Sequence, residues 1–131
     1  MSDRIPVLLV DDDPDLRAVT ASYLEREADR IAVETAAEPA GGLDVLAERD
    51  VECVVSDYEM PERDGLEFLD EVRERHPDLP FILFTGRGSE AVASEAISAG
   101  VTDYLQKRGG TERYERLANR IVEAVEKRRA E

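Results

Sequence analysis

Five short apolar runs alternate with segments of helical periodicity along the 131 residues of this chain. The runs cover 5–10, 31–36, 51–56, 81–84 and 104–106. Several are apolar on both faces, which is typical of central strands in a parallel sheet covered by helices. One helical segment begins at Pro14, and the others cover 38–49, 65–75, 89–100 and 112–128. This alternation predicts an α/β fold, a doubly wound five-stranded parallel sheet with helices on both faces.

Local signals support several of these helices. Asp13 precedes Pro14, an order typical of an N-cap residue followed by a proline at the first helical position. Ser89 is the expected N-cap of the fourth helix, whereas Gly41 and Gly42 weaken the prediction of the second. Spacings of three and four residues predict an inward stripe in the first helix, formed by Leu16, Val19, Thr20, Tyr23 and Leu24.

Charge limits the classes of partner. There are 31 acidic and 17 basic residues, a formal net charge of −14, and a field of this sign repels nucleic acid and anionic membranes. Direct binding to either is therefore not expected. The acidic excess is spread along the chain, and we interpret it as an adaptation to a salt-rich cytoplasm, as in halophilic organisms.

Cellular location is suggested by two further features of the sequence. No apolar run approaches the roughly 20 residues that a membrane helix needs. The single cysteine, Cys53, cannot form an internal disulfide, and this fits a reducing cytoplasm. We therefore expect a cytoplasmic protein.

Polar residues stand at the ends of four predicted strands. Asp11 and Asp12 follow the first run, and Asp57 follows the third. Thr85 follows the fourth run and Lys107 the fifth. Ligands of doubly wound sheets bind outside the carboxyl ends of the strands. We therefore expect three carboxylates, a hydroxyl and an ammonium group to converge on one edge of the sheet.

Crowded carboxylates repel one another and need a compensating charge. Carboxylate and carbonyl oxygens are the ligands that Mg²⁺ prefers, with waters completing its octahedron. A magnesium ion bound near Asp11, Asp12 and Asp57 would supply the missing positive charge. Asp13 is expected to cap the first helix and not to bind metal.

Four motifs, in order, carry a resemblance to a known family: "LLVDDD", "VVSDYEMPERDG", "FILFTG" and "DYLQK". With these motifs the chain resembles a receiver domain of the two-component response regulators, of the chemotaxis-regulator type, over residues 5 to about 125. The resemblance implies a flavodoxin-like fold with strand order 2-1-3-4-5. It also implies a single receiver domain over 1–131 without an effector domain. Such a domain works alone or as one piece of a longer signalling protein, and the unbroken last helix favours the second arrangement.

The resemblance also implies roles for the residues at the strand ends. Asp57 would accept a phosphoryl group from a phosphohistidine on a partner kinase. Asp12 and Asp57 would ligate Mg²⁺ together with the backbone carbonyl of Glu59, while Asp11 would act mainly through a bound water. Lys107 would neutralise charge on the transferring phosphoryl group. The protein would then be a signalling switch that catalyses its own phosphorylation and dephosphorylation, and not a conventional enzyme.

Signal output is implied to depend on Thr85 and Tyr104. The Thr85 hydroxyl would donate a hydrogen bond to the phosphoryl group, and Tyr104 would turn inward as the threonine moves. The expected partners are a sensor histidine kinase or phosphotransfer protein, and a downstream protein or fused output domain. A homodimer would use the surface of helix 89–99, strand 103–106 and helix 111–128.

This sequence departs from the family pattern after Lys107. Arg108 and two glycines stand where the family usually has a proline, which replaces a fixed turn by flexible residues. Glu59 and Arg87 have opposite charges two residues past Asp57 and Thr85. We expect them to pair across the mouth of the site and to control access of water.

Two alternatives to a phosphoaccepting receiver remain at this point. Asp11 and Asp13 form a D-x-D pair, as in Mg²⁺-dependent phosphohydrolases of the haloacid dehalogenase type, although the chain is short for their cap domain. A degenerate receiver that acts only as a binding module is the other. An EF-hand is excluded, because Leu16 stands where that loop needs glycine and Ser22 where it needs glutamate.

Overall fold

The computed structural model describes residues 3–86 and 90–131. Its sheet has five strands in the order β2-β1-β3-β4-β5, and each neighbouring pair is parallel. The predicted fold class and strand order are therefore confirmed. The strands are β1 (Ile5–Val10), β2 (Ile31–Ala36), β3 (Cys53–Ser56), β4 (Phe81–Thr85) and β5 (Asp103–Gln106).

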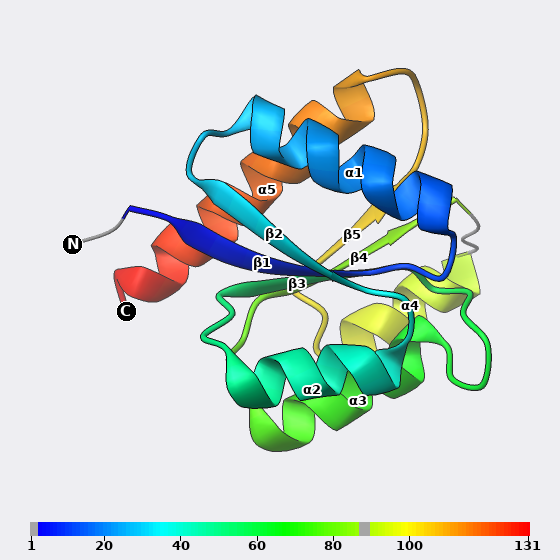
Figure 1. Cartoon of the computed structure of the whole chain (residues 1–131). Helices are drawn as coiled ribbons and strands as arrows, with labels where there is room; N and C mark the ends of the chain where they lie inside the picture. The colour runs from blue at the N-terminus through cyan, green and yellow to red at the C-terminus, as the bar shows by residue number, and fades with distance from the viewer. Residues whose placement is uncertain (1–2, 87–89) are drawn as a thin grey trace.

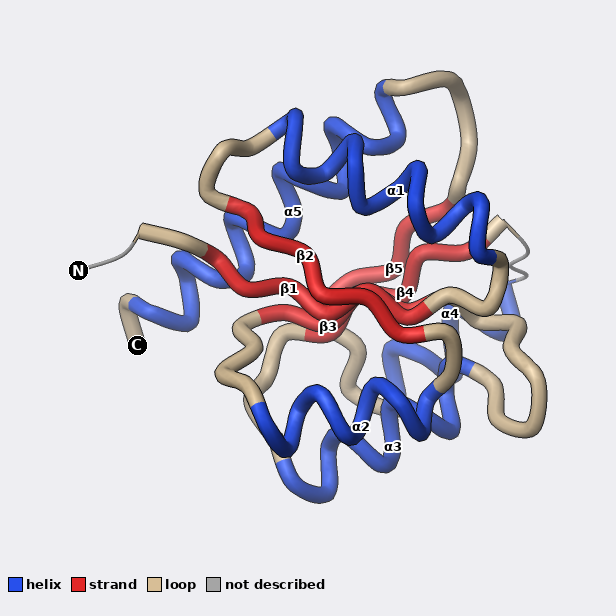
Figure 2. The backbone as a smooth tube through the Cα atoms, viewed as in Figure 1, coloured by secondary structure: helices blue, strands red, loops and turns tan. Residues whose placement is uncertain are grey.

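Helices cover both faces of this sheet (Figure 1). One layer holds α1 and α5, and the other holds α2, α3 and α4, with the strands between them in Figure 2. The start of β1 and the end of α5 lie at the amino edge of the sheet, and loops form the opposite, carboxyl edge. The helices are α1 (Pro14–Glu27), α2 (Pro39–Glu48), α3 (Gly65–Arg75), α4 (Glu90–Ser98) and α5 (Glu112–Arg129).

Separate hydrophobic cores fill the two faces. On one, strand residues pack against Leu24 of α1 and Ile121 of α5, which are fully buried. On the other, they pack against Phe68 and Val72 of α3. Consecutive residues of β1 alternate between the two cores, so the central strands are apolar on both faces as the sequence predicts. Burial on both faces fixes the register of the strands and hence the height at which each one ends.

Helix α1 begins as predicted but does not bury the whole predicted stripe. Asp13 caps it, accepting hydrogen bonds from the backbone N–H groups of Asp15 and Leu16, each at 3.1 Å. Thr20 is buried, but Val19 is 43% exposed, so the prediction that Val19 faces inward is wrong. At 3.6 residues per turn, Val19 lies about 120° around the helix from the midpoint of the two buried positions, Thr20 and Leu24. The contact with the sheet is therefore narrower than the apolar stripe.

Helix α2 continues through Gly41 and Gly42, and Gly42 allows the helix to pack closely against the sheet. A Cβ atom at Gly42 would lie 3.0 Å from Cζ of Phe68 and 3.1 Å from Cγ2 of Val10. The absence of a side chain lets α2 lie directly on the sheet.

Elsewhere the predicted bounds shift by a few residues: β3 begins at Cys53 and not at residue 51. The predicted N-cap Ser89 lies outside the described residues.

No helix within residues 3–86 and 90–131 combines the length and the apolar character needed to cross a bilayer.

Candidate functional site

The carboxyl edge of the sheet brings together the five residues that the sequence places at strand ends. Asp11 and Asp12 directly follow β1, and Asp57 directly follows β3. Thr85 is the last residue of β4, and Lys107 directly follows β5. The Lys107 N–H donates to the Thr85 carbonyl at 2.9 Å, so the ladder continues one step beyond β5 and holds the lysine at the edge.

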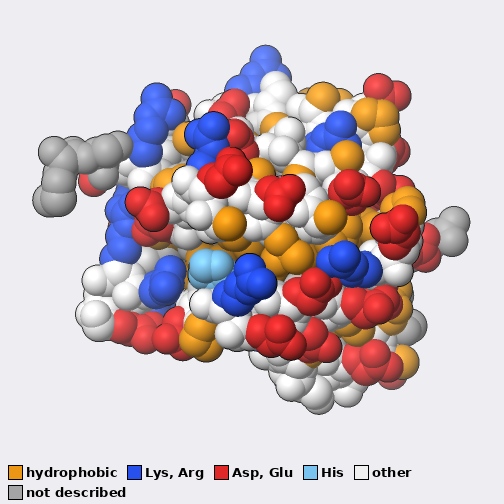
Figure 3. All heavy atoms as spheres, turned by 60° about the horizontal axis from the view of Figure 1, so that its bottom comes forward, with side chains coloured by type: hydrophobic (Ala, Val, Ile, Leu, Met, Phe, Trp, Pro, Cys, Tyr) orange, Lys and Arg blue, Asp and Glu red, His pale blue; other side chains and the backbone are white. Residues whose placement is uncertain are grey.

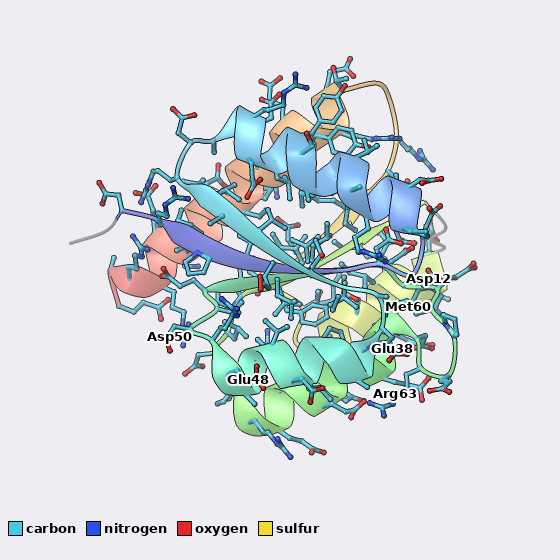
Figure 4. The ribbon with its side chains drawn as sticks, viewed as in Figure 1. Asp12, Glu38, Glu48, Asp50, Met60 and Arg63 are labelled. Atoms are coloured by element: carbon cyan, nitrogen blue, oxygen red, sulfur yellow. The ribbon has the colours of Figure 1, made fainter. Side chains whose placement is uncertain are left out.

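Figure 4 labels side chains at both the carboxyl and the amino edge of the sheet. Asp12 and Met60 lie together at the carboxyl edge, where the loops after β1 and β3 meet. Glu48 and Asp50 lie at the opposite edge, in the segment that leads into β3. Acidic side chains are therefore found at both ends of the molecule, and Figure 3 shows them spread over the face that carries α2 and α3, with lysine and arginine among them. What distinguishes the carboxyl edge is the convergence of acidic groups from separate strands.

Three carboxylates form a compact group at this edge. One oxygen each from Asp11, Asp12 and Asp57 lie within 4.8 Å of one another, an arrangement that suits a hard divalent cation. Asp11 is buried, and its two oxygens accept hydrogen bonds from the backbone N–H of Asp13 at 3.0 Å and from Lys107 at 3.1 Å. Asp12 is exposed and makes no hydrogen bond to the rest of the described chain. Its oxygens are the ones most accessible to an incoming ion.

Lys107 supplies the positive charge of the group. Its Nζ lies 3.1 Å from Oδ2 of Asp11 and 3.5 Å from Oδ2 of Asp57, and its side chain is only 8% exposed. The ammonium group also lies 5.5 Å from the centre of the Phe84 ring, within range of a cation–π contact. These contacts hold a long, flexible side chain in one place between two carboxylates.

The electrostatics of Asp57 reflect a half-buried position. Burial raises the pKa of its carboxyl, and the Asp11 carboxylate adds to this rise. The Lys107 ammonium lowers the pKa, as do hydrogen bonds from the Tyr58 backbone N–H, at 2.7 Å, and from the Thr85 side chain. Burial prevails, so the pKa lies above its ordinary value. An ionised Asp57 is therefore a poorly solvated carboxylate surrounded by oriented donors.

Gly65 is a structural requirement of the site that sequence reasoning missed. A Cβ atom there would lie 2.5 Å from the Asp57 carbonyl oxygen and 2.8 Å from Cδ1 of Leu83. The start of α3 can therefore lie directly against the backbone of Asp57 only because residue 65 has no side chain. Asp64 caps this helix and forms a capping box with Glu67, and the "RDG" sequence at 63–65 was the available signal.

Arg17 is the second residue that sequence reasoning missed. From the second turn of α1 its Nη1 donates a hydrogen bond to the backbone carbonyl of Asp11, at 2.7 Å. Its position four residues after the N-cap is unusual for a cation, because the N-terminus of a helix carries a partial positive charge. That position was the only signal in the sequence.

Two predicted residues lie around the acidic group. Glu59 lines an open hollow at the carboxyl edge, together with Leu16 and three of the strand-end residues, Asp57, Thr85 and Lys107. Tyr104 of β5 is half-buried against the core under α2 and α3, and its buried hydroxyl has no hydrogen-bond partner among residues 3–86 and 90–131. Arg87 lies outside the described residues, so its pairing with Glu59 stays a prediction.

Comparison with known families and sequences identifies what the chain is similar to. The response regulator receiver domain family matches residues 7–119. A response regulator described as NtrX-like, from Rickettsia bellii, is 34% identical over 127 residues, which are 95% of this chain and 26% of that protein. The transcriptional regulatory protein FixJ of Azorhizobium caulinodans is 36% identical over 107 residues, 82% of this chain and 50% of that protein. The chain thus spans between a quarter and a half of these relatives.

Solved structures show the same similarity in three dimensions. A response regulator receiver domain protein from Clostridium thermocellum superposes with a TM-score of 0.85 at 25% identity, covering 96% of this chain and 98% of its own. The chemotaxis response regulator CheY4 of Vibrio cholerae superposes with a TM-score of 0.80 at 27% identity, covering 90% and 98%. Both comparisons extend over nearly the whole of each chain.

Proposed function

The chain belongs to the response regulator receiver domain family, and from that premise we propose that Asp57 accepts a phosphoryl group from a phosphohistidine on a partner histidine kinase or phosphotransfer protein. One observation carries the proposal. The Asp57 carboxylate meets two other carboxylates and the Lys107 ammonium at one edge of the sheet, with oxygens within 4.8 Å and the ammonium at 3.5 Å. Phosphoryl transfer depends on this kind of positioning and charge neutralisation.

The donor set of the site suits Mg²⁺. Asp12 and Asp57 would hold the ion together with the backbone carbonyl of Glu59. Asp11 would act through a bound water, because both of its carboxylate oxygens already accept hydrogen bonds from protein groups. The ion would neutralise negative charge on the phosphoryl oxygens.

The chain's own residues divide the remaining work. An Asp57 oxygen forms a bond to phosphorus as the bond from phosphorus to the histidine nitrogen breaks, and the bonding electrons leave with the imidazole. The product is an acyl phosphate on Asp57. Lys107, which lies between the carboxylates, neutralises the added charge, and the Tyr58 N–H and the Thr85 hydroxyl orient the carboxylate.

Output of the signal is assigned to Thr85 and Tyr104. The Thr85 hydroxyl contacts Asp57 directly, so it would respond to the new charge there by donating to a phosphoryl oxygen. Tyr104 lies two residues before Gln106, the last residue of β5, and Gln106 pairs with Thr85 of β4. A shift of the threonine is therefore transmitted to the tyrosine through adjacent strands. One new charge cluster would bias a two-state element in this way.

Partners are expected on the surface of α4, β5 and α5, where a homodimer or a downstream protein would bind. We propose that 1–131 is one receiver domain with its core at about 5–125. Because the chain spans only 26% of the NtrX-like relative, attachment to an output domain belongs to the proposal as well.

The setting we propose is a salt-rich cytoplasm of a halophilic organism. A net charge of −14 spread over the surface destabilises the fold at low ionic strength through self-repulsion. Stability should therefore rise steeply with KCl concentration. Equal thermal stability in dilute buffer and in molar KCl would contradict this part of the proposal.

One experiment tests the proposed function. The protein is incubated with Mg²⁺ and a small phosphodonor, and the bound label is compared with that in Asp57→Asn. We expect stoichiometric, acid-stable and base-labile label on the wild type only. Rapid release over many turnovers would indicate a phosphohydrolase, and a wild type without label would indicate a degenerate receiver.

A further inference from the structure

Arg17 occupies a position that its charge alone does not explain. It lies in the first turns of α1, where the partial positive charge of the helix end disfavours a cation. Four of the six residues before it are aspartates, yet within the described residues its guanidinium forms no ion pair. It folds back and donates to the backbone carbonyl of Asp11 at 2.7 Å. A half-buried arginine is thus used to bind one peptide group.

The hydrogen bonds of Asp11 account for why that carbonyl needs a donor. The Asp11 N–H donates to the Ala36 carbonyl at the end of β2, at 3.2 Å. Both oxygens of the Asp11 side chain are also occupied. The backbone carbonyl is the one polar group of Asp11 still to be paired, and Asp11 is only 2% exposed. Within the described chain, Arg17 donates the hydrogen bond to this carbonyl. Buried backbone groups without a partner are strongly disfavoured.

This carbonyl belongs to the peptide group that joins Asp11 to Asp12. Rotation of the group changes ψ of one residue and φ of the next, and so moves the Asp12 carboxylate relative to Asp57. We propose that Arg17 is a positioning residue: by fixing this peptide group it sets the affinity of the three carboxylates for Mg²⁺. The inference rests on the proposed function, which requires that ion.

The direction in which Mg²⁺ affinity changes on replacing Arg17 distinguishes a positioning role from a purely electrostatic one. Arg17 is itself a cation near the acidic group, so loss of its charge alone would tighten binding of a second cation. Loss of its hydrogen bond would weaken binding, and outer contacts of this kind change metal affinity by about tenfold or more. The two roles therefore predict opposite changes.

The test is calorimetric titration of Mg²⁺ into the wild type, Arg17→Met and Arg17→Gln. Methionine keeps the aliphatic stem without donors, and glutamine keeps an N–H donor without the charge. We expect the Mg²⁺ dissociation constant to rise about tenfold in Arg17→Met and less in Arg17→Gln. Arg26→Met, near the other end of α1, is the charge-matched control and should bind as the wild type does.

Each outcome is informative. A wild type that does not bind Mg²⁺ would contradict the proposed function and not the role of Arg17 specifically. A wild type that binds Mg²⁺, with Arg17→Met binding equally well or more tightly, would overturn the inference alone. Loss of folding in Arg17→Met, detected by circular dichroism, would indicate a general structural role and would overturn it too.

Discussion

Lys107 and Asp11 are 96 positions apart in the chain, yet Nζ of the lysine lies 3.1 Å from Oδ2 of the aspartate. Their side chains are 8% and 3% exposed. A buried charge is tolerated only when it is paired and hydrogen-bonded. Each of these two groups therefore depends on the other, and the pair fixes the end of β5 against the end of β1.

Removal of the Lys107 charge should destabilise the protein. In Lys107→Met, Asp11 keeps its buried charge without the ammonium group, and the loss of one partner from a buried pair costs about 3 kcal/mol. Urea unfolding in EDTA measures this change, and Mg²⁺ should restore part of the loss by supplying positive charge. Lys127→Met, at an exposed position of α5, is the matched control and should change stability little. Equal stability of the two variants would contradict the importance of the pair.

Asp57→Asn should be more stable than the wild type when metal is absent. Because the folded state raises the pKa of Asp57, the fold disfavours its ionised form. Between the ordinary pKa of 3.8 and the raised pKa, the folded state binds more protons than the unfolded state, so this contribution to stability falls as pH rises. The variant should melt at a higher temperature at pH 7 in EDTA, and the difference should shrink as pH falls toward 3.8. A difference that grows toward low pH would contradict the assigned sign.

Gly65→Ala should disturb the site through the backbone. Its Cβ would lie 2.5 Å from the Asp57 carbonyl oxygen, and relief of such overpacking costs about 2 kcal/mol. We expect lower stability and slower phosphorylation, because residue 57 must move. At Gly41 of α2, an added Cβ makes only an ordinary contact of 3.6 Å with Ala36, so Gly41→Ala should be neutral or stabilising by up to about 1 kcal/mol. Unfolding curves and phosphorylation rates of both variants check this contrast.

Much of this fold follows from local pattern. The alternation of apolar runs with helical segments sufficed for the fold class, because a strand followed by a helix and another parallel strand has few arrangements. The Asp13 cap could be predicted because its side chain accepts hydrogen bonds only from the first turn of its own helix, within three residues in sequence. Val19 was misplaced because an apolar residue at helical spacing faces inward only where the neighbouring layer is wide enough to cover it.

The convergence at the site was also predictable, for a topological reason. Parallel strands end at one edge, so residues that follow different strands must meet there. Gly65 and Arg17 were not predictable in this way. Their roles depend on how closely the start of α3 approaches Asp57 and on how one side chain folds back onto a carbonyl, and neither leaves a periodic signal in the sequence.

Tyr104→Phe should stabilise the unphosphorylated protein. The Tyr104 hydroxyl is buried and has no hydrogen-bond partner in the described part of the chain, and such a group costs about 1 kcal/mol or more. Phenylalanine keeps the ring that packs against the core and removes the unpaired oxygen. Thermal unfolding should show a higher melting temperature. A lower melting temperature would contradict this prediction, because it would mean that a favourable contact of the hydroxyl holds Tyr104 in place.

Localisation of the phosphoryl group shows whether Asp57 is the residue that accepts it. After incubation with Mg²⁺ and a small phosphodonor, borohydride reduces an aspartyl phosphate to homoserine, which mass spectrometry assigns to one residue. We expect homoserine at position 57 in the wild type, and none when Mg²⁺ is replaced by EDTA. Unmodified aspartate at 57, or a phosphoryl group on another residue, would contradict it.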